Sequence, residues 1–222
     1  MAAHKLTKKE LKKDSFITTM LQAFEFSKTH QNMLFVGLLI VIVIIAGSIW
    51  FTNARRQTRE EASSQFSEGL AMFRAGDLKT SEELFKMVSE RHANIQEGTY
   101  SFFFAGKCAL LGGRNTDAIE WFDEYLERSG KFPFFKDAAM DGKAVALENE
   151  RRYGEAAVVY FELAQHIETN RFMENVYLRR AAENFELGGQ HDRAIEIMEE
   201  LVEKTTGIEK LELEIELKVL KS

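Results

Sequence analysis

Few residues in this sequence have the types and spacing that catalysis requires. The tripeptide Gly106-Lys107-Cys108 has the order of the last residues of a phosphate-binding loop. That loop needs an earlier glycine five residues before its Gly-Lys pair, whereas the nearest one here, Gly98, is too far upstream. A cysteine also replaces the Ser or Thr that would bind the metal. The segment is better explained by a small residue for helix packing, followed by an exposed lysine.

The titratable residues give no stronger candidate. The five histidines are scattered, without the spacing of a metal site. Acidic pairs such as Glu199-Glu200 fit solvated helix faces better than paired catalytic carboxylates. The single cysteine, Cys108, excludes an internal disulfide and argues against a zinc site. We therefore expect no enzymatic activity, no catalytic or metal-binding residue, and no cofactor.

An uncharged apolar run of 19 residues, Met33 to Phe51, is the clearest pattern in the chain. As a helix it spans about 28 Å, close to the thickness of the bilayer hydrocarbon. Leu34 and Phe35 belong to its N-terminal end. Trp50 and Phe51 place aromatic rings at its C-terminal end, where they suit the membrane–water interface. A cleaved signal peptide would be shorter, nearer the N-terminus and followed by small residues. We therefore predict a transmembrane helix at 33–51, in contact with lipid.

The charge distribution gives this helix a direction. The whole chain carries −6 and the first 51 residues carry +3, so the rest carries −9. The lysines of the tail, residues 1–32, place it in the cytoplasm, although Arg55, Arg56 and Arg59 nearly balance the lysines closest to the span. We expect no nucleic-acid partner, because binding phosphates needs basic residues and the larger part of the chain is acidic.

Within the tail, residues 15–28 carry apolar residues at helical spacing. This stripe fits an amphipathic helix on the inner leaflet, with its lysines toward anionic head groups. It fits equally a helix that extends the transmembrane segment. The sequence leaves both alternatives open.

After residue 51 the sequence predicts helices that are interrupted by glycines, at 75–77, 111–114 and 187–190. An internal repeat aligns Thr116–Leu126, Tyr153–Leu163 and His191–Leu201, with a weaker copy at Leu78–Val88. Each copy has a small residue, then large residues four and seven positions later. The small residues are spaced by 37, 38 and 38 positions, and another small residue precedes each by twelve: Gly69, Gly106, Ala144 and Ala182.

This spacing has a structural explanation. Small residues on paired helices let the helices cross closely, and the large residues line the buried face. A single hairpin cannot bury its own apolar face, so successive copies must stack.

The pattern resembles the tetratricopeptide repeat, which has small residues at positions 8 and 20, a loop glycine near 15 and large residues at 24 and 27. The resemblance implies repeats at 62–98, 99–136, 137–174 and 175–207, after a juxtamembrane linker helix at 52–61. The departures are a period longer than 34 residues, the missing prolines at position 32, and Arg151 where the third loop would have glycine.

In that family, positions 2, 5, 9 and 12 of each repeat line a groove that binds protein segments. The resemblance therefore implies a partner-binding groove that is apolar in the first repeats and charged in the last. Its residues would be Ser63, Phe66, Leu70, Phe73, Tyr100, Phe103, Lys107, Leu110, Ala138, Asp141, Val145, Glu148, Val176, Arg179, Glu183 and Glu186. The alternative is that neighbouring helices, or the segment emerging from the membrane, fill the aromatic end of the groove.

Residues 208–222 fit two patterns. Leu211, Leu213 and Ile215 alternate with charged residues as in a strand, whereas Ile208, Leu211, Ile215 and Val219 fall on one helical face. Stacked repeats need a last element to cover their open face, so we expect a capping helix. The predicted fold class is all-α: N-terminal amphipathic and transmembrane helices, an α-solenoid of about four tetratricopeptide-like helical hairpins, and a C-terminal capping element.

The arrangement of a lysine-rich tail with LTKKELKKDSF (residues 6–16), one anchor and diverged repeats resembles the bacterial ancillary subunit of the Sec translocon. The resemblance implies an inner-membrane protein with a cytoplasmic N-terminus and periplasmic repeats. It also implies Sec translocon subunits and periplasmic chaperones as partners, and a non-catalytic adaptor role in protein secretion or folding. The alternative is a self-associating scaffold of an envelope or division complex.

Overall fold

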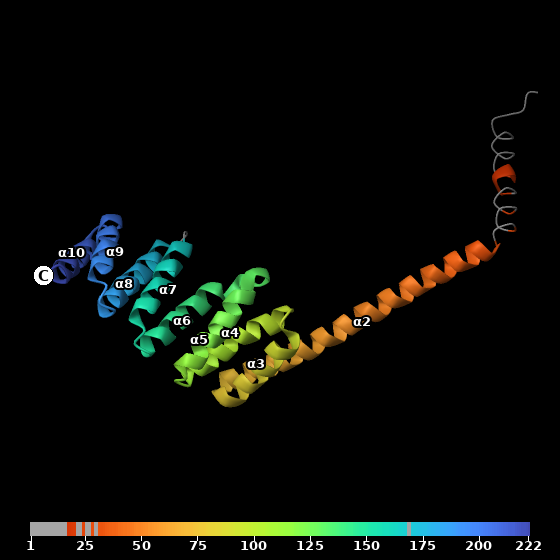
Figure 1. Cartoon of the computed structure of the whole chain (residues 1–222), viewed down its shortest axis with the longest axis horizontal. Coiled ribbons are helices and arrows are strands. Elements are labelled where there is room, and N and C mark those ends of the chain that lie inside the picture. The colour runs from red at the N-terminus through yellow and green to blue at the C-terminus, as the bar shows by residue number, and fades with distance from the viewer. Residues whose placement is uncertain (1–16, 21–23, 25–27, 29–30, 168–169) are drawn as a thin grey trace, which may run out of the picture. The chain divides into compact units, whose positions relative to one another are not determined.

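The computed structural model describes residues 17–20, 24, 28, 31–167 and 170–222. These residues are almost entirely helical and include no strand (Figure 1). The helices are α2 (Gln31–Ala75), α3 (Leu78–His92), α4 (Gln96–Leu111), α5 (Asn115–Arg128), α6 (Lys136–Asn149), α7 (Tyr153–His166), α8 (Arg171–Leu187), α9 (His191–Lys204) and α10 (Ile208–Leu220), with 3-10 turns η1 (Ser129–Lys131) and η2 (Pro133–Phe135).

The chain divides into two compact units, residues 1–57 and 58–222. In the first unit, α2 carries the uncharged run, and Met33, Phe35 and Trp50 expose most of their side chains. Among the described residues, α2 is the one helix long and apolar enough to cross a membrane. Of the stripe predicted at 15–28, residues 17–20, 24 and 28 are helical, and the others lie outside the described residues.

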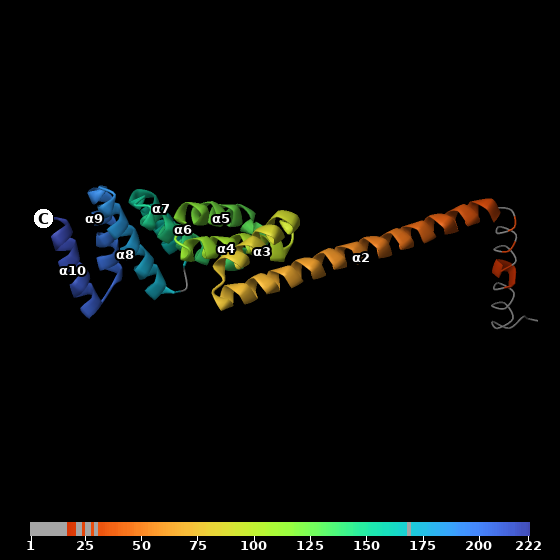
Figure 2. The ribbon, with the colours of Figure 1, turned by 90° about the horizontal axis from the view of Figure 1, so that it is seen from below.

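The second unit is a solenoid of helical hairpins. Residues 58–75 of α2 pair with α3, where the rings of Phe66 and Phe85 meet with centroids 5.5 Å apart. The pairs α4/α5, α6/α7 and α8/α9 follow, and from α3 to α10 each helix packs against the next. Figure 2 shows these hairpins following one another in chain order. The all-α fold of about four tetratricopeptide-like hairpins is therefore confirmed.

The turns inside the hairpins share one backbone conformation. Gly76, Gly113 and Gly189 have φ of 81°, 73° and 74°, in the left-handed region that glycine adopts without a steric penalty. In the second turn, the amide of Arg114 donates to the carbonyl of Ala109 at 2.9 Å, which closes the first helix. The glycine interruptions predicted these helix ends.

The third turn keeps this conformation without glycine. Arg151 has a φ of 59°, and the amide of Arg152 donates to the carbonyl of Leu147 at 2.9 Å, as in the other turns. The packing of the hairpin therefore imposes the left-handed conformation on Arg151, although a residue with a side chain disfavours it.

The small and large residues of the repeat pattern interlock as predicted. A Cβ added to Gly69 would lie 2.9 Å from the ring of Phe85, and one added to Gly106 would lie 2.8 Å from the ring of Phe122. These distances are shorter than van der Waals contact, so glycine is the residue that lets the large ring of the second helix reach the first. The two small residues of the first hairpin also bond directly. The hydroxyl of Ser81 on α3 donates to the carbonyl of Gly69 on α2, twelve positions earlier, at 2.9 Å.

The C-terminal segment is a helix, so the capping-helix prediction is confirmed over the strand alternative. α10 packs on α9 and buries Leu213, with Leu217 and Leu220 partly buried beside it. Its opposite face stays open: Ile208, Leu211, Ile215 and Val219 are exposed by 80%, 58%, 59% and 70%.

Candidate functional site

The residues predicted for the groove lie on the first helix of each hairpin, namely on α2, α4, α6 and α8. Contacts join these first helices to one another. Phe104 of α4 meets Phe66 and Phe73 of α2, with ring centroids 5.6 and 6.0 Å apart. Hydrogen bonds from Arg180 join α8 to α6, and α4 contacts α6. The first helices therefore form a continuous layer, which we call the first-helix surface.

The aromatic end of this surface is packed. Phe66, Leu70 and Phe73 are partly buried against Phe85, Ala105 and Cys108. Lys107 lies over two rings, with its Nζ 5.9 Å from the centroid of Phe73 and 5.8 Å from that of Phe103. Its side chain is partly exposed and places one positive charge on an aromatic floor.

Phe103 itself belongs to the core. It is 4% exposed and stacks on Phe135 of η2, with centroids 4.5 Å apart and planes at 3°. Tyr100 is partly exposed and meets the same Phe135 ring edge-on at 4.8 Å. Leu110 is likewise partly buried against the core. The rings of Phe103 and Phe135 thus pack successive hairpins together, and Tyr100, Lys107 and Leu110 are the groove residues of α4 that stay partly exposed.

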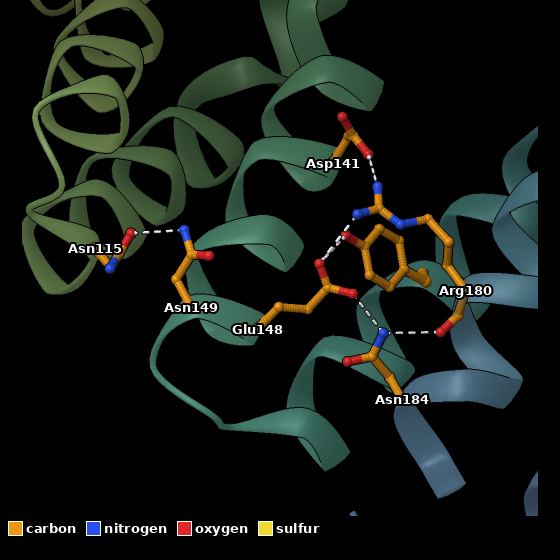
Figure 3. A network of polar contacts seen from close by, with 7 residues as sticks. Asn115, Asp141, Glu148, Asn149, Arg180 and Asn184 are labelled. Atoms are coloured by element: carbon orange, nitrogen blue, oxygen red, sulfur yellow. Dashed lines mark hydrogen bonds and ion pairs between the residues drawn. The ribbon is translucent and has the colours of Figure 1, made fainter. Parts of the chain in front are cut away.

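At the polar end, Arg180 of α8 lies between two carboxylates of α6 (Figure 3). Its Nη2 donates to Oε2 of Glu148 at 3.0 Å, and its Nη1 donates to Oδ1 of Asp141 at 3.5 Å. The phenol of Tyr160 donates to the same Glu148 oxygen at 3.1 Å, and Asn184 donates to the other carboxylate oxygen at 2.5 Å. The guanidinium also covers the Tyr160 ring at 4.4 Å. Two predicted groove residues, Asp141 and Glu148, are therefore joined in one network.

Burial sets the electrostatics of this network. Desolvation raises the pKa of the Asp141 carboxyl above its usual value, the nearby Arg180 lowers it, and Glu148 raises it further. The pKa of the Tyr160 phenol is also raised, chiefly by burial, so the phenol stays a hydrogen-bond donor at any physiological pH. The network is a set of structural contacts between α6, α7 and α8, and its carboxylates are already paired.

The last predicted residues line a cleft between α8 and α10. Arg179 donates to Glu216 of α10 at 3.1 Å, and Glu183 lies beside this pair. The cleft has a volume of about 240 Å³ and a partly apolar floor that includes Met198 and Leu220. Glu183 is exposed, but partial desolvation in the cleft raises the pKa of its carboxyl. Val145 of α6 is partly buried on the same first-helix surface.

Sequence reasoning missed Arg180, Tyr160 and Asn184. Arg180 directly follows Arg179, which the repeat numbering selected, and the pair of arginines was the available signal. Tyr160 was recognised as a large residue of the repeat but not as a hydrogen-bond donor. No pattern along the chain indicated that one arginine would meet carboxylates 39 and 32 positions earlier.

The geometry offers little to catalysis in the described part of the chain. It contains no group of three or more metal-binding side chains. Cys108 is fully buried, and desolvation raises the pKa of its thiol, so it is a poor nucleophile. Its Sγ lies 3.4 Å from the hydroxyl of Ser81, which identifies it as a packed core residue.

No protein-family model matches this chain, and no curated protein sequence matches it. Among solved structures it is similar to a putative kinesin light chain with nearly identical TPR-like repeats from Podosopora anserina, with a TM-score of 0.52 and 16% identity over 72% of this chain and 94% of that one. A crystal structure of a variant of that protein gives 0.51 and 16% over 72% and 93%. At this identity the likeness concerns the fold, and it agrees with the tetratricopeptide-like hairpins described above.

Proposed function

We propose that this chain is a non-catalytic, membrane-tethered adaptor that binds protein partners through its first-helix surface. The observation that carries this proposal is a set of accessible polar and aromatic groups on two of the first helices, Tyr100 and Lys107 on α4 and Arg179 and Glu183 on α8. Tetratricopeptide-like folds typically act as scaffolds for protein interactions. Charged groups of both signs beside a partly apolar floor suit a segment with apolar anchors and charged flanks.

The tether is the second part of the proposal. In the first unit, the uncharged residues 33–51 of α2 leave their described large side chains exposed, Phe51 and Ile49 among them at 49% and 56%. A helix with such side chains on all sides is stable where lipid covers them. Arg55 stacks on Phe51, with its guanidinium carbon 4.2 Å from the ring centroid, and so places a charge where the interface would lie. We propose that lipid surrounds residues 33–51.

We further propose that the N-terminus is cytoplasmic and that the repeats work at the extracytoplasmic face of a bacterial inner membrane, assisting protein secretion or folding. This part rests on the lysine bias of the tail and on the resemblance to the translocon subunit. Single cysteines near Lys9 and near Glu199, in a Cys108-free background, test it by labelling from each side. The proposal predicts that only the cysteine near Glu199 reacts with an impermeant reagent added outside. The reverse pattern would contradict it.

The partners are tested by chemical crosslinking in native membranes, followed by mass spectrometry. The secretion role predicts that translocon subunits or periplasmic folding factors are recovered. Recovery of neither class would count against the secretion role. The adaptor role is tested separately, by photocrosslinking from the first-helix surface.

A second candidate function is self-association as a structural scaffold. The observation that favours it is the open apolar stripe of α10, because such a stripe is usually covered by another helix. Light scattering of the detergent-solubilised chain, corrected for detergent, distinguishes the two. The scaffold role predicts a dimer that Leu211→Glu/Ile215→Glu converts to a monomer. A monomeric wild-type chain would exclude it.

A further inference from the structure

A further cavity of the solenoid lies away from the first-helix surface. It is a groove of about 630 Å³ formed by α3, α5 and one residue of α4. Its floor is aromatic: the rings of Phe102 and the partly exposed Trp121 lie next to each other, tilted by 45°, with centroids 6.0 Å apart. Nothing in the adaptor surface described above involves these rings.

The walls of this groove are acidic. Five carboxylates line it and one arginine, Arg128, accompanies them. Asp123 is neutralised by Lys143 of α6, with 2.6 Å between Nζ and Oδ1. Glu90 and Glu120 are exposed on opposite walls, α3 and α5, and form no ion pair with any residue that the structure describes. The groove therefore keeps an excess of negative charge beside its aromatic floor.

Arg128 shows which chemistry the groove accepts. Its guanidinium carbon lies 4.8 Å from the centroid of the Phe102 ring, and the same group pairs with Glu124 and, at 3.9 Å, with Glu127. A cation held between a ring face and carboxylates gains both the cation–π and the ionic attraction. Arg128 covers Phe102, whereas the partly exposed Trp121 and the unpaired Glu90 and Glu120 provide the same combination next to it.

We propose that this groove is a second docking site, which binds an arginine- or lysine-bearing segment of a partner protein. Basic side chains would lie over Trp121 and pair with Glu90 and Glu120 on the two walls. The volume accommodates a few side chains, and the open groove lets the segment's backbone run between α3 and α5. The site is separate from the first-helix surface, so a partner could be held at one site while the other is occupied.

The test uses the full chain in zwitterionic nanodiscs and a fluorescein-labelled peptide, Gly-Arg-Gly-Arg-Gly-Arg. Trp50→Phe leaves Trp121 as the only tryptophan, so its emission reports occupancy of the groove directly. Anisotropy of the labelled peptide gives the Kd. The decisive variant is Glu90→Gln/Glu120→Gln. Its matched control, Glu162→Gln/Glu196→Gln, removes the same charge from exposed positions on α7 and α9.

We expect saturable binding, a change in Trp121 emission, and a Kd that rises about fivefold in Glu90→Gln/Glu120→Gln but less than about 1.5-fold in the control. Equal weakening in both double variants would overturn the proposal, because it would indicate attraction to the overall negative charge. Absence of binding would also overturn it. A third outcome would also overturn it: spermine at the same concentration displaces the peptide and causes the same change in Trp121 emission. The groove would then bind small polycations in general. Trp121→Leu gives a further check, provided its circular dichroism is unchanged, and should abolish the preference for the peptide over spermine.

Discussion

The guanidinium of Arg180 on α8 donates to Oε2 of Glu148 on α6 at 3.0 Å, which joins the first helices of two successive hairpins. The same carboxylate accepts from Tyr160 of α7 and from Asn184 of α8. One carboxylate thus fixes three helices in register. The relative position of the hairpins, and with it the shape of the first-helix surface, depends on this contact.

Arg180→Leu should lower the free energy of unfolding by about 2 kcal/mol, because it leaves Asp141 and Glu148 without their cation in a partly buried place. Urea unfolding of the full chain, followed by far-UV circular dichroism, measures this loss. Arg179→Leu is the matched control: its ion pair with Glu216 is more exposed, so we expect a loss below about 1 kcal/mol. Equal losses in the two variants would contradict the role assigned to Arg180.

Asp141→Asn should change how stability depends on pH. Burial raises the pKa of Asp141, so between its unfolded and folded pKa values the folded chain binds more protons than the unfolded chain. This residue's contribution to stability therefore grows as pH falls through the raised pKa and is lost as pH rises through it. The wild type should gain stability relative to the variant between pH 7 and pH 4 in urea unfolding. Glu162→Gln, at an exposed position, should show a smaller change across the same range.

Arg151→Gly should stabilise the chain by about 1 kcal/mol, because glycine adopts the left-handed conformation at 59° without the cost that a side chain incurs. Gly189→Ala, at the corresponding turn, should destabilise by about the same amount, since its φ is 74°. Thermal unfolding of both variants measures the two signs. A destabilised Arg151→Gly variant would mean that the arginine side chain contributes more than its backbone strain costs.

Tyr125→Phe should lower the free energy of unfolding by about 1–2 kcal/mol. The phenol donates to the carbonyl of Phe132 at 3.0 Å and accepts from the amide of Phe135 at 2.9 Å, so it fixes the segment that joins the second and third hairpins. Tyr153→Phe is the control, because the Tyr153 hydroxyl makes no hydrogen bond within the described residues. Urea unfolding measures both free energies of unfolding, and an equal, small loss in the two variants would contradict the role assigned to the Tyr125 hydroxyl.

Much of this fold could be predicted because it follows from short-range rules. Glycines that end helices and small residues twelve positions apart both depend on local backbone geometry and on the contact between neighbouring helices, as the fit of Phe122 against Gly106 illustrates. The helix at 208–220 was harder to predict, since its alternating leucines also fit a strand. Packing of Leu213 against α9 decides it, and that contact depends on the whole stack.

The candidate site was less predictable for a physical reason. Repeat numbering places side chains on a face, but it does not say which of them neighbouring helices cover. Phe103 was selected by number, yet the turn at 133–135 brings Phe135 onto its ring and removes it from the surface. The groove of Trp121 was missed because its walls come from different hairpins and its acidic residues look, in sequence, like solvated helix faces.

Site-specific photocrosslinking in native membranes tests the central claim, that the first-helix surface binds a protein partner. Photoreactive residues would replace Lys107, Val145 or Glu183 on first helices, and Glu162 or Glu196 on second helices as controls. The account predicts a discrete crosslinked partner from the first-helix positions and none from the controls. Crosslinks that are absent from the first-helix positions, or equally strong from both sets, would contradict it.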